Sequence, residues 1–457
     1  MDSQSSSKHH IAMFPWFAFG HFTPYLHISN ELAKRGHRIS FLLPKKAQLQ
    51  LQHLNLYPDS ITFHVITVPQ VEGLPHGTET VSDIDNSLQP LLVAAMDLTR
   101  DQVKGLLHQL KPDFVFFDFM HWIPELATDL GFESVYYIII SAASVAIALV
   151  PGRKVPKDRL LTEDELMEPP LGYPSTKILF RKHEARSLIF LSYEFGKGIT
   201  FYERNTIGMK QCDAISFRTC RELEGPFCDY IQNQYGKPVL LTGPVLPEPS
   251  QSPMEDMWVN WLAKFEPCEV VFCAFGSQLT LDMKQFQELV LGIELTSLPF
   301  LVALKPPVGA ATIEDALPEG FLERISGKGM VCGTMVPQTQ ILNHPSVGCF
   351  VNHCGFGSMW ESLMSHCQIV LIPHLGDQIL NTRILSEELQ VAVEVDKDEN
   401  GWFSKESVCE AIKMVMDTDS KVGQFLRGNQ EKCKTKLLKP DFVSNYIDEF
   451  VQQLDKL

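Results

Sequence analysis

The chain has 457 residues, of which 45% are hydrophobic, and a formal net charge of −16. This length predicts two or three domains, and the hydrophobic content is ample for buried cores. Nucleic acids and anionic membrane surfaces repel an acidic protein, so the charge argues against either as the main partner.

The amino-terminal residues MDSQSSSKHH are polar, and Pro15 and Gly20 interrupt the apolar residues that follow before the hydrophobic region of a signal peptide can develop. The longest apolar run, residues 135–150, is shorter than the roughly 20 residues that a membrane helix needs, and contains two serines. We expect a buried strand followed by a helix there, and no membrane span. The eleven cysteines are scattered without a CxxC pair, which supports neither a disulfide framework nor a zinc knuckle. A cytoplasmic protein is therefore expected.

Apolar strand candidates alternate with helical stretches in the first half of the chain. The helical stretches include residues 24–35 and 87–110. This alternation predicts a parallel sheet covered by helices, that is, an α/β fold. The strand candidates are residues 11–14, 38–43, 61–66, 114–118 and 135–140.

The same rhythm restarts in the second half, after a stretch rich in proline, serine and acidic residues. We place a linker in that stretch, at residues 243–256, between domains at 1–242 and 257–440. The pattern of residues 442–454 is helical, so residues 441–457 are expected to form a carboxy-terminal helix. The strand candidates of the second half are residues 269–275, 300–304, 329–333, 347–351, 368–373 and 391–395.

Residues 345–364 combine features of an anion site. Residues 345–353 resemble a buried strand, and residues 354–364 a turn that leads into a helix, whose free N–H groups suit a diphosphate. Gly355 and Gly357 allow close approach to the backbone, and His353 and Ser358 add hydrogen-bond donors. A structural alternative exists, because Ser358 and Glu361 have the spacing of a capping box.

His21 stands apart among the histidines because it follows the first strand and precedes a helix that Thr23 can cap, with Pro24 in its first turn. Asp118 has the equivalent place after another strand, among apolar neighbours, where a carboxylate needs a partner. In such sheets ligands bind at the carboxyl ends of the strands. If the two residues pair, His21 is a candidate base and Asp118 orients it. The alternative is a histidine that makes only a structural hydrogen bond. His9 and His10 are expected to be solvated tail residues, and His27 to have a surface or packing role.

The 44 residues from Met335 to Gln378 closely resemble the donor-binding signature of plant family 1 UDP-sugar-dependent glycosyltransferases, which has the same length. PWFAFGH, FDFMHWIPELA and HCGFGSMWES resemble the branch that extends sugars on flavonoid glycosides. The resemblance implies the GT-B arrangement: two Rossmann-like doubly wound domains facing across a cleft. The first domain would bind the acceptor, the second the UDP-sugar, and the final helix would cross back onto the first.

The resemblance also implies roles for individual residues. His21 and Asp118 would be catalytic, Glu361 would bind the ribose, and Asp377 with Gln378 the sugar hydroxyls. His353, Ser358 and Ser277 would bind the diphosphate, and Ser141 is a weaker candidate for the donor sugar. The full set expected to contact the donor is Ser141, Ser277, Met335, Val336, Gln338, His353, Gly355, Gly357, Ser358, Glu361, Asp377 and Gln378.

Met335 departs from the family, which has a tryptophan there that stacks on uracil. Stacking of a base on an aromatic ring contributes about 1 to 3 kcal/mol, and a sulfur–ring contact about 0.3 to 1.5 kcal/mol. We expect uridine binding to be weaker by about tenfold.

The expected reaction is a single displacement that inverts the anomeric carbon, with glucose favoured as the sugar by Gln378 and a flavonoid glycoside as the acceptor. UDP-sugar is then a co-substrate, and no metal is required. D-x-D patterns occur at residues 83–85 and 417–419, where helix capping is a sufficient reason for them. An aromatic acceptor pocket is as plausible as core packing for Trp16, Phe17, Phe19, Phe119 and Trp122.

Two other functions are compatible with these residues. Met335 is compatible with a non-catalytic UDP-sugar binder, and a GT-B-like UDP-sugar epimerase would alter the donor without any acceptor. P-loop, GxGxxG and GxSxG motifs are absent from the expected places.

Overall fold

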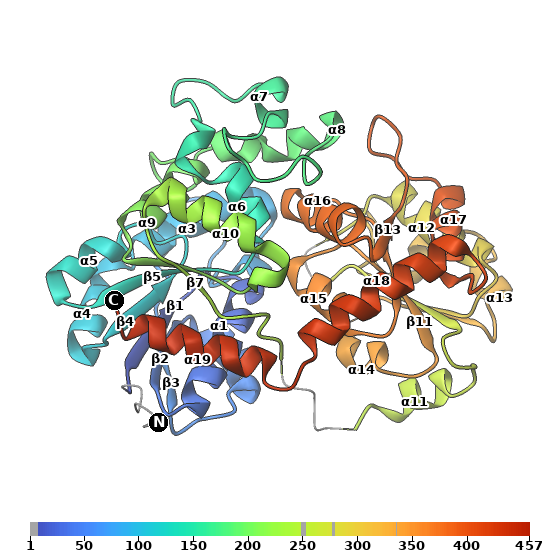
Figure 1. Ribbon diagram of the computed structural model, residues 1–457, viewed down its shortest axis with the longest axis horizontal. Helices are drawn as coiled ribbons and strands as arrows, with labels where there is room; N and C mark the ends of the chain where they lie inside the picture. Colours follow the sequence, from blue (N-terminus) through green and yellow to red (C-terminus); the bar gives the residue numbers. More distant parts are fainter. Residues whose placement is uncertain (1–7, 248–252, 277–278, 335) are drawn as a thin grey trace. The chain divides into compact units, whose positions relative to one another are not determined.

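The computed structural model describes residues 8–247, 253–276, 279–334 and 336–457 (Figure 1). The chain forms two compact units. The first comprises residues 1–174, 187–247 and 441–457, and the second comprises residues 175–186 and 248–440. Residues 175–186 thus belong to the second unit although they precede the predicted linker at residues 243–256 in the sequence. The predicted domain boundary does not account for them.

The first unit is built on a seven-stranded parallel sheet with the order β3-β2-β1-β4-β5-β6-β7. The chain runs outward from β1 on one side and from β4 on the other, which is the order of a doubly wound fold. Its strands are β1 (His10–Phe14), β2 (Arg38–Leu43), β3 (Ile61–Val65), β4 (Phe114–Phe117), β5 (Glu133–Ile138), β6 (Ala214–Phe217) and β7 (Val239–Leu241).

Five of these strands coincide with the strand candidates of the sequence. The central ones are apolar along their whole length because they are covered on both faces. All residues of β1 and β4 are buried. The two strands at the far edge, β6 and β7, have only four and three residues. Neither of them was among the strands predicted from the sequence.

The helices of the first unit alternate with its strands. The predicted helix at residues 87–110 is two helices that are separated at Leu98 and Thr99. The helices are α1 (Phe19–Lys34), α2 (Lys45–Leu51), α3 (Gln89–Asp97), α4 (Arg100–Leu110), α5 (Ile123–Leu130), α6 (Ala142–Ala148), α7 (Glu163–Met167), α9 (Phe201–Gln211), α10 (Arg221–Tyr235) and α19 (Phe442–Leu454). Short 3-10 turns are η1 (Gln52–Leu54), η2 (Val81–Asp83), η3 (Asn86–Leu88), η4 (Pro151–Arg153) and η5 (Arg186–Ser192).

Helix α19 belongs to the first unit although it is the last element of the chain (Figure 1). Its apolar face is buried, and the Phe450 ring lies 5.9 Å from the ring of Phe116 in β4. Arg35 binds Asp448 at 2.6 Å, and the Tyr446 hydroxyl donates to Glu222 at 2.7 Å.

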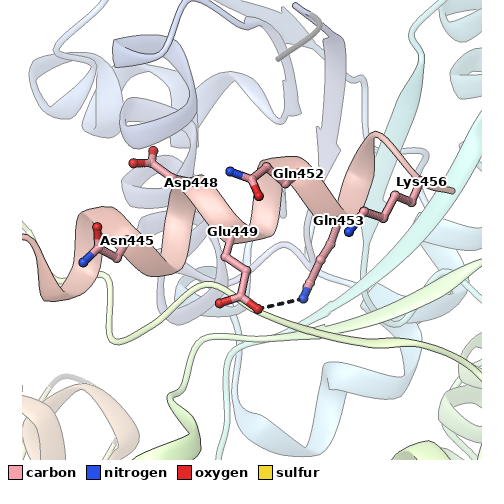
Figure 2. Close-up of a pocket in the computed structure, with 6 residues that line it drawn as sticks. All are labelled: Asn445, Asp448, Glu449, Gln452, Gln453 and Lys456. Atoms are coloured by element: carbon pink, nitrogen blue, oxygen red, sulfur yellow. Dashed lines mark hydrogen bonds between the residues drawn. The ribbon is translucent and has the colours of Figure 1, made fainter. Parts of the chain in front are cut away.

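The outer face of α19 is polar. It bears a surface pocket lined by residues of α19 and by Lys456 just beyond its end, with Glu449 and Gln453 joined by a hydrogen bond (Figure 2). A pocket lined by one face of a helix and the residues that follow it encloses no ligand, so we assign it no function. The lining residues are Asn445, Asp448, Glu449, Gln452, Gln453 and Lys456.

The second unit repeats the architecture with six parallel strands in the order β10-β9-β8-β11-β12-β13. Here the winding reverses between β8 and β11. Each of the six strands overlaps an apolar run found in the sequence. They are β8 (Val270–Ala274), β9 (Phe300–Ala303), β10 (Gly329–Cys332), β11 (Val347–Asn352), β12 (Gln368–Leu371) and β13 (Ala392–Glu394).

The helices of the second unit include one from the inserted segment. They are α8 (Lys182–Ala185), α11 (Asp256–Leu262), α12 (Met283–Leu295), α13 (Phe321–Arg324), α14 (Gln338–Leu342), α15 (Phe356–Met364), α16 (Gly376–Arg383), α17 (Lys405–Met416) and α18 (Lys421–Leu437). A 3-10 turn, η6 (Glu314–Ala316), precedes α13, and a π-helical turn, η7 (Ile384–Glu388), continues α16.

A buried ion pair ties the inserted segment to the second unit. Glu184 of α8 accepts a hydrogen bond from Arg383 of α16 at 2.5 Å, and Arg383 also pairs with Glu394 of β13. All three side chains are less than a tenth exposed. Removing one partner would leave a buried charge uncompensated, so this cluster accounts for where residues 175–186 lie.

In the part of the chain that the structure describes, no helix is both long enough and apolar enough to traverse a lipid bilayer.

Candidate active site

The switch point of the first sheet brings two sequence-distant segments together. Strands β1 and β4 are neighbours, and Met13 and Phe14 pair with Phe116 and Phe117. Because both strands are parallel, the residues that follow them meet at the same edge. Asp118 comes directly after β4, and His21 lies in the first turn of α1 after β1.

His21 and Asp118 are in contact at this edge. Nδ1 of His21 lies 2.6 Å from Oδ2 of Asp118, and the other carboxylate oxygen accepts the backbone N–H of Trp16 at 2.7 Å. The Asp118 side chain is 6% exposed, whereas the imidazole is 19% exposed. Because the carboxylate occupies Nδ1, that nitrogen carries the proton, and Nε2 is left as the nitrogen that can accept one.

Aromatic rings surround this pair. The Phe119 ring lies 5.5 Å from the His21 ring, 5.6 Å from Phe195 and 5.4 Å from Phe201. The Phe190 ring, which is 37% exposed, lies 4.8 Å from Phe201. Phe119, Phe195 and Phe201 are each partly exposed. We call the rings of Phe119, Phe190, Phe195 and Phe201 the aromatic wall.

The aromatic wall differs from the five rings that the sequence singled out. Trp16, Phe17 and Trp122 are buried and serve core packing, while Phe119 and Phe19 are partly exposed. The rings at positions 190, 195 and 201 come from a segment about 70 to 80 residues beyond Asp118. No periodicity or motif in that segment marks it, so only the folded chain shows where these rings lie.

The switch point of the second sheet assembles the segment expected to bind the donor. Gly276 follows β8, and His353 follows β11, with Phe275 placing its ring 6.1 Å from that of His353. A Cβ at Gly276 would lie 3.2 Å from the His353 ring, and one at Gly355 would lie 2.8 Å from its Nε2. A larger residue at position 355 would collide with the imidazole, and Gly276 has a φ of +64°, which disfavours a side chain.

His353 is 9% exposed, and its Nδ1 has no hydrogen-bond partner among the described residues. Burial lowers the pKa of this imidazole to about 4. His353 is therefore neutral near pH 7 and can donate one hydrogen bond without adding a charge.

The amino end of α15 is open. The helix begins after Gly355, and no side chain caps it. A Cβ added at Gly357 would meet nothing within 4 Å, so there is free space in front of this turn. Ser358 is the third helical residue and not the N-cap, and Glu361 bonds elsewhere. The capping-box interpretation of Ser358 and Glu361 is therefore wrong, and the N–H groups of the first turn remain available to an anion.

The Glu361 side chain accepts hydrogen bonds from the neighbouring helix α14. Gln338 donates to one of its carboxylate oxygens at 2.5 Å, and Thr339 to the other at 3.3 Å. Glu361 and Gln338 are both partly exposed. The fixed carboxylate can accept further hydrogen bonds, since each oxygen has two lone pairs.

Asp377 and Gln378 lie in the first turn of α16. Loss of hydration raises the pKa of Asp377 to about 6. The Gln378 side-chain oxygen accepts the backbone N–H groups of His374 and Leu375 at 3.0 and 3.1 Å. The side chain of Gln378 thus caps the helix through its oxygen, and only its amide N–H groups are left to donate to a ligand.

The remaining predicted donor contacts have other surroundings. Val336 packs against the core formed around Trp258 and Ile341. Ser141 is fully buried, and its hydroxyl lies 2.7 Å from that of Ser144. Ser277 and Met335 lie outside the described residues.

His9 and His10 are not solvated tail residues, as the sequence had suggested. His10 belongs to β1, is 7% exposed and hydrogen-bonds Ser40 at 2.9 Å. His9 stacks on His37 and binds Asp455 at 2.7 Å. Polar residues at a chain end look disordered in sequence, but here strand pairing and α19 hold them.

The D-x-D segments have structural surroundings. Asp83 accepts the backbone N–H of Thr80 at 2.9 Å and pairs with Lys46, and Asp417 is the C-cap of α17. Within the described ranges, no three or more His, Cys, Asp or Glu side chains are grouped so that they could hold a metal ion.

Known proteins resemble the chain along its length. Residues 326–426 match the family described as UDP-glucoronosyl and UDP-glucosyl transferase. The chain is 58% identical over 452 residues to UDP-glycosyltransferase 79B6 of Arabidopsis thaliana, covering 99% of this chain and 98% of that protein. It belongs to the plant family of UDP-sugar-dependent glycosyltransferases.

A second relative of this glycosyltransferase carries a more specific name. The chain is 54% identical over 460 residues to anthocyanidin 3-O-glucoside 2'''-O-xylosyltransferase of Arabidopsis thaliana, covering 100% of this chain and 98% of that protein. As a member of the family, the protein is an enzyme that transfers a sugar from a UDP-sugar co-substrate.

Solved structures share the fold. The structure of Glycyrrhiza uralensis UGT73P12 complexed with glycyrrhetinic acid 3-O-monoglucuronide has a TM-score of 0.81 at 19% identity, covering 98% of this chain and 96% of that chain. TcCGT1 in complex with UDP has a TM-score of 0.79 at 20% identity, covering 98% and 100%. The predicted fold class, GT-B with two Rossmann-like units, is confirmed for this glycosyltransferase.

Proposed function

We propose that the enzyme transfers glucose from UDP-glucose to a hydroxyl on the sugar of a flavonoid glycoside, with inversion at the anomeric carbon. Support for the acceptor comes from the relative that is named as a xylosyltransferase of an anthocyanidin 3-O-glucoside, at 54% identity over the whole chain. That name makes UDP-xylose the second donor to test, because the two sugars differ by one hydroxymethyl group.

In the proposed reaction His21 is the general base. Nε2 takes the proton of the acceptor hydroxyl while the oxygen attacks the anomeric carbon, and Asp118 stabilises the imidazolium that forms. The observation that carries this assignment is the 2.6 Å contact between Nδ1 of His21 and the buried carboxylate. The aromatic wall beside His21 is the proposed binding surface for the flat flavonoid rings.

In the second unit we propose that the diphosphate binds at the amino end of α15. The uncapped N–H groups, the Ser358 hydroxyl and a neutral His353 would stabilise the charge that grows on the leaving UDP. Glu361 would accept from the ribose hydroxyls, and Asp377 with the amide N–H groups of Gln378 would bind the sugar.

The test is a matrix of UDP-sugars against aglycones and their 3-O-glucosides, read by mass spectrometry. We expect a mass gain of one hexose on a flavonol or anthocyanidin 3-O-glucoside with UDP-glucose. Consumption of aglycones alone would refute the sugar-extending assignment, and a pentose gain with UDP-xylose alone would replace the donor. NMR of UDP-glucose incubated with the enzyme alone tests the epimerase alternative, since a transferase leaves the sugar unchanged.

A further inference from the structure

A fully buried arginine lies next to the proposed catalytic pair. Arg204 of α9 has 0% side-chain exposure. Its guanidinium pairs with both carboxylate oxygens of Asp97, at 2.9 and 2.6 Å. Asp97 also accepts the indole N–H of Trp122 at 3.0 Å. None of these residues belongs to the proposed chemistry.

Besides a 3.2 Å contact between Nη1 and Nδ1 of His121, the guanidinium of Arg204 donates to the backbone that carries the aromatic wall. Nε donates to the carbonyl of Phe195 at 2.8 Å, and Nη1 to the carbonyl of Phe119 at 3.1 Å. Phe119 directly follows Asp118, and its ring faces His21 at 5.5 Å. One guanidinium therefore ties the turn after β4 to the loop at residue 195.

The loop at residue 195 passes very close to the guanidinium. A Cβ at Gly196 would lie 2.2 Å from Nη2 of Arg204 and 3.2 Å from an oxygen of Asp97. Gly196 also has a φ of +96°, a conformation that disfavours a side chain. The backbone at Gly196 therefore packs directly against the side chains of Arg204 and Asp97.

Stability alone is a weak explanation for this pair. Desolvation of the buried guanidinium offsets much of its attraction to Asp97, whose side chain is 25% exposed, and well-packed apolar residues often stabilise as well as a buried charge does. A buried guanidinium can instead fix the positions of its partners, because its planar group directs several hydrogen bonds at fixed angles. Here two of those bonds fix the main chain under Phe119 and Phe195.

We propose that Arg204, held by Asp97, is a positioning residue that sets the aromatic wall at its distance from His21 and thereby determines acceptor binding. This inference rests on the proposed function, in which that wall binds the flavonoid rings. It assigns no contact between Arg204 and the substrate.

The test is Arg204→Lys, assayed with an anthocyanidin 3-O-glucoside and a flavonol 3-O-glucoside. Lysine can keep a bond to Asp97, but its single ammonium group cannot reproduce the planar guanidinium. We expect the KM for the glycoside to rise at least tenfold, while the KM for the UDP-sugar changes by less than twofold. A structural defect without positioning would lower kcat or the amount of folded enzyme and leave the ratio of the two KM values unchanged.

Arg35→Lys is the matched control. Arg35 also makes several bonds within the first unit, to Glu31, Ser444 and Asp448. It caps the carboxyl end of α1, fourteen positions after His21 and about 21 Å away along a helix. We expect both KM values to stay within twofold in this variant.

Asp97→Asn keeps the shape of the side chain that pairs with Arg204 but removes its charge, which weakens the pairing. It should therefore raise the glycoside KM by a smaller factor than Arg204→Lys does. It replaces Arg204→Lys if that variant does not fold. An unchanged glycoside KM in whichever variant folds overturns the inference, provided that the unmodified enzyme turns over a glycoside. If the unmodified enzyme turns over no glycoside, the proposed function is overturned instead.

Discussion

Nδ1 of His21 lies 2.6 Å from Oδ2 of Asp118, although the two residues are separated by 97 positions in the chain. The carboxylate is held in turn by the backbone N–H of Trp16 at 2.7 Å. The imidazole is therefore fixed at one nitrogen and free to accept a proton at the other, which is how a base is arranged for attack by a hydroxyl.

His21→Ala is expected to lower kcat for sugar transfer by at least about 10², because general-base catalysis contributes that much. Binding of UDP, measured by calorimetry, should remain within twofold of the unmodified value. Asp118→Asn should also lower kcat, since the amide cannot stabilise the imidazolium. A wild-type rate in His21→Ala would rule out this histidine as the base.

Glu361→Ala is expected to weaken UDP binding by about 10- to 100-fold, because hydrogen bonds to a charged group contribute about 1.5 to 3 kcal/mol. Thr339→Val is the matched control, since it removes only the 3.3 Å bond to one oxygen of the same carboxylate. Calorimetric titration of both variants with UDP decides the matter. Equal affinities in the two variants would exclude Glu361 as the group that binds the ribose.

The fold and the pairing at the first switch point follow from simple sequence features. Short, fully apolar runs such as residues 114–117 predict buried strands, and polar residues directly after such strands collect at one edge of a parallel sheet. That reasoning brings His21 and Asp118 together without any knowledge of side-chain contacts. It also places His353 after β11, where the structure has it.

Contacts between segments that lack a recognisable motif or periodicity could not be predicted from the sequence. The position of the loop that carries Phe195 depends on hydrogen bonds from the buried Arg204, which also contacts Asp97 and the carbonyl of Phe119 in distant segments of the chain. A charged residue in a helix is usually exposed to solvent, so the burial of Arg204 could not be predicted from the sequence. The transfer of residues 175–186 to the second unit depends on Glu184 and Arg383 in the same way.

Glu224→Gln is expected to flatten the pH dependence of stability. Glu224 is fully buried, accepts the Ala143 N–H at 3.0 Å and the Thr219 hydroxyl at 2.7 Å, and burial raises its pKa from 4.5 to about 7. Because the folded-state pKa lies above the unfolded one, the stabilisation is complete below pH 4.5 and is lost as the pH rises through 7. The shift corresponds to at most about 3 kcal/mol at 1.36 kcal/mol per pKa unit.

Urea unfolding at pH 5.5 and pH 8.5 measures this effect. The unmodified protein should lose more stability between the two pH values than Glu224→Gln does. Glu222→Gln, an exposed position in the same helix, is the control and should behave like the unmodified protein. Parallel pH profiles for the unmodified protein and Glu224→Gln would contradict the prediction.

The affinity for UDP-sugar is expected to fall as the pH decreases through 6, because of Asp377. Loss of hydration raises the pKa of this carboxyl to about 6, and the protonated form accepts fewer hydrogen bonds from sugar hydroxyls. A ligand that prefers the ionised form loses affinity below the pKa of the free enzyme, up to about tenfold one pH unit below it. His353, with a pKa of about 4, stays neutral throughout this window.

The measurement is the dissociation constant of a UDP-sugar between pH 5 and pH 7.5. The intact donor is the better probe than UDP, whose terminal phosphate has a second pKa near 6, as other phosphate monoesters do. Asp377→Asn removes the titrating group, so its affinity should be lower at pH 7.5 and independent of pH across the range. If Asp377→Asn keeps the pH step, the step belongs to another group, and Asp377 does not bind the sugar in its ionised form.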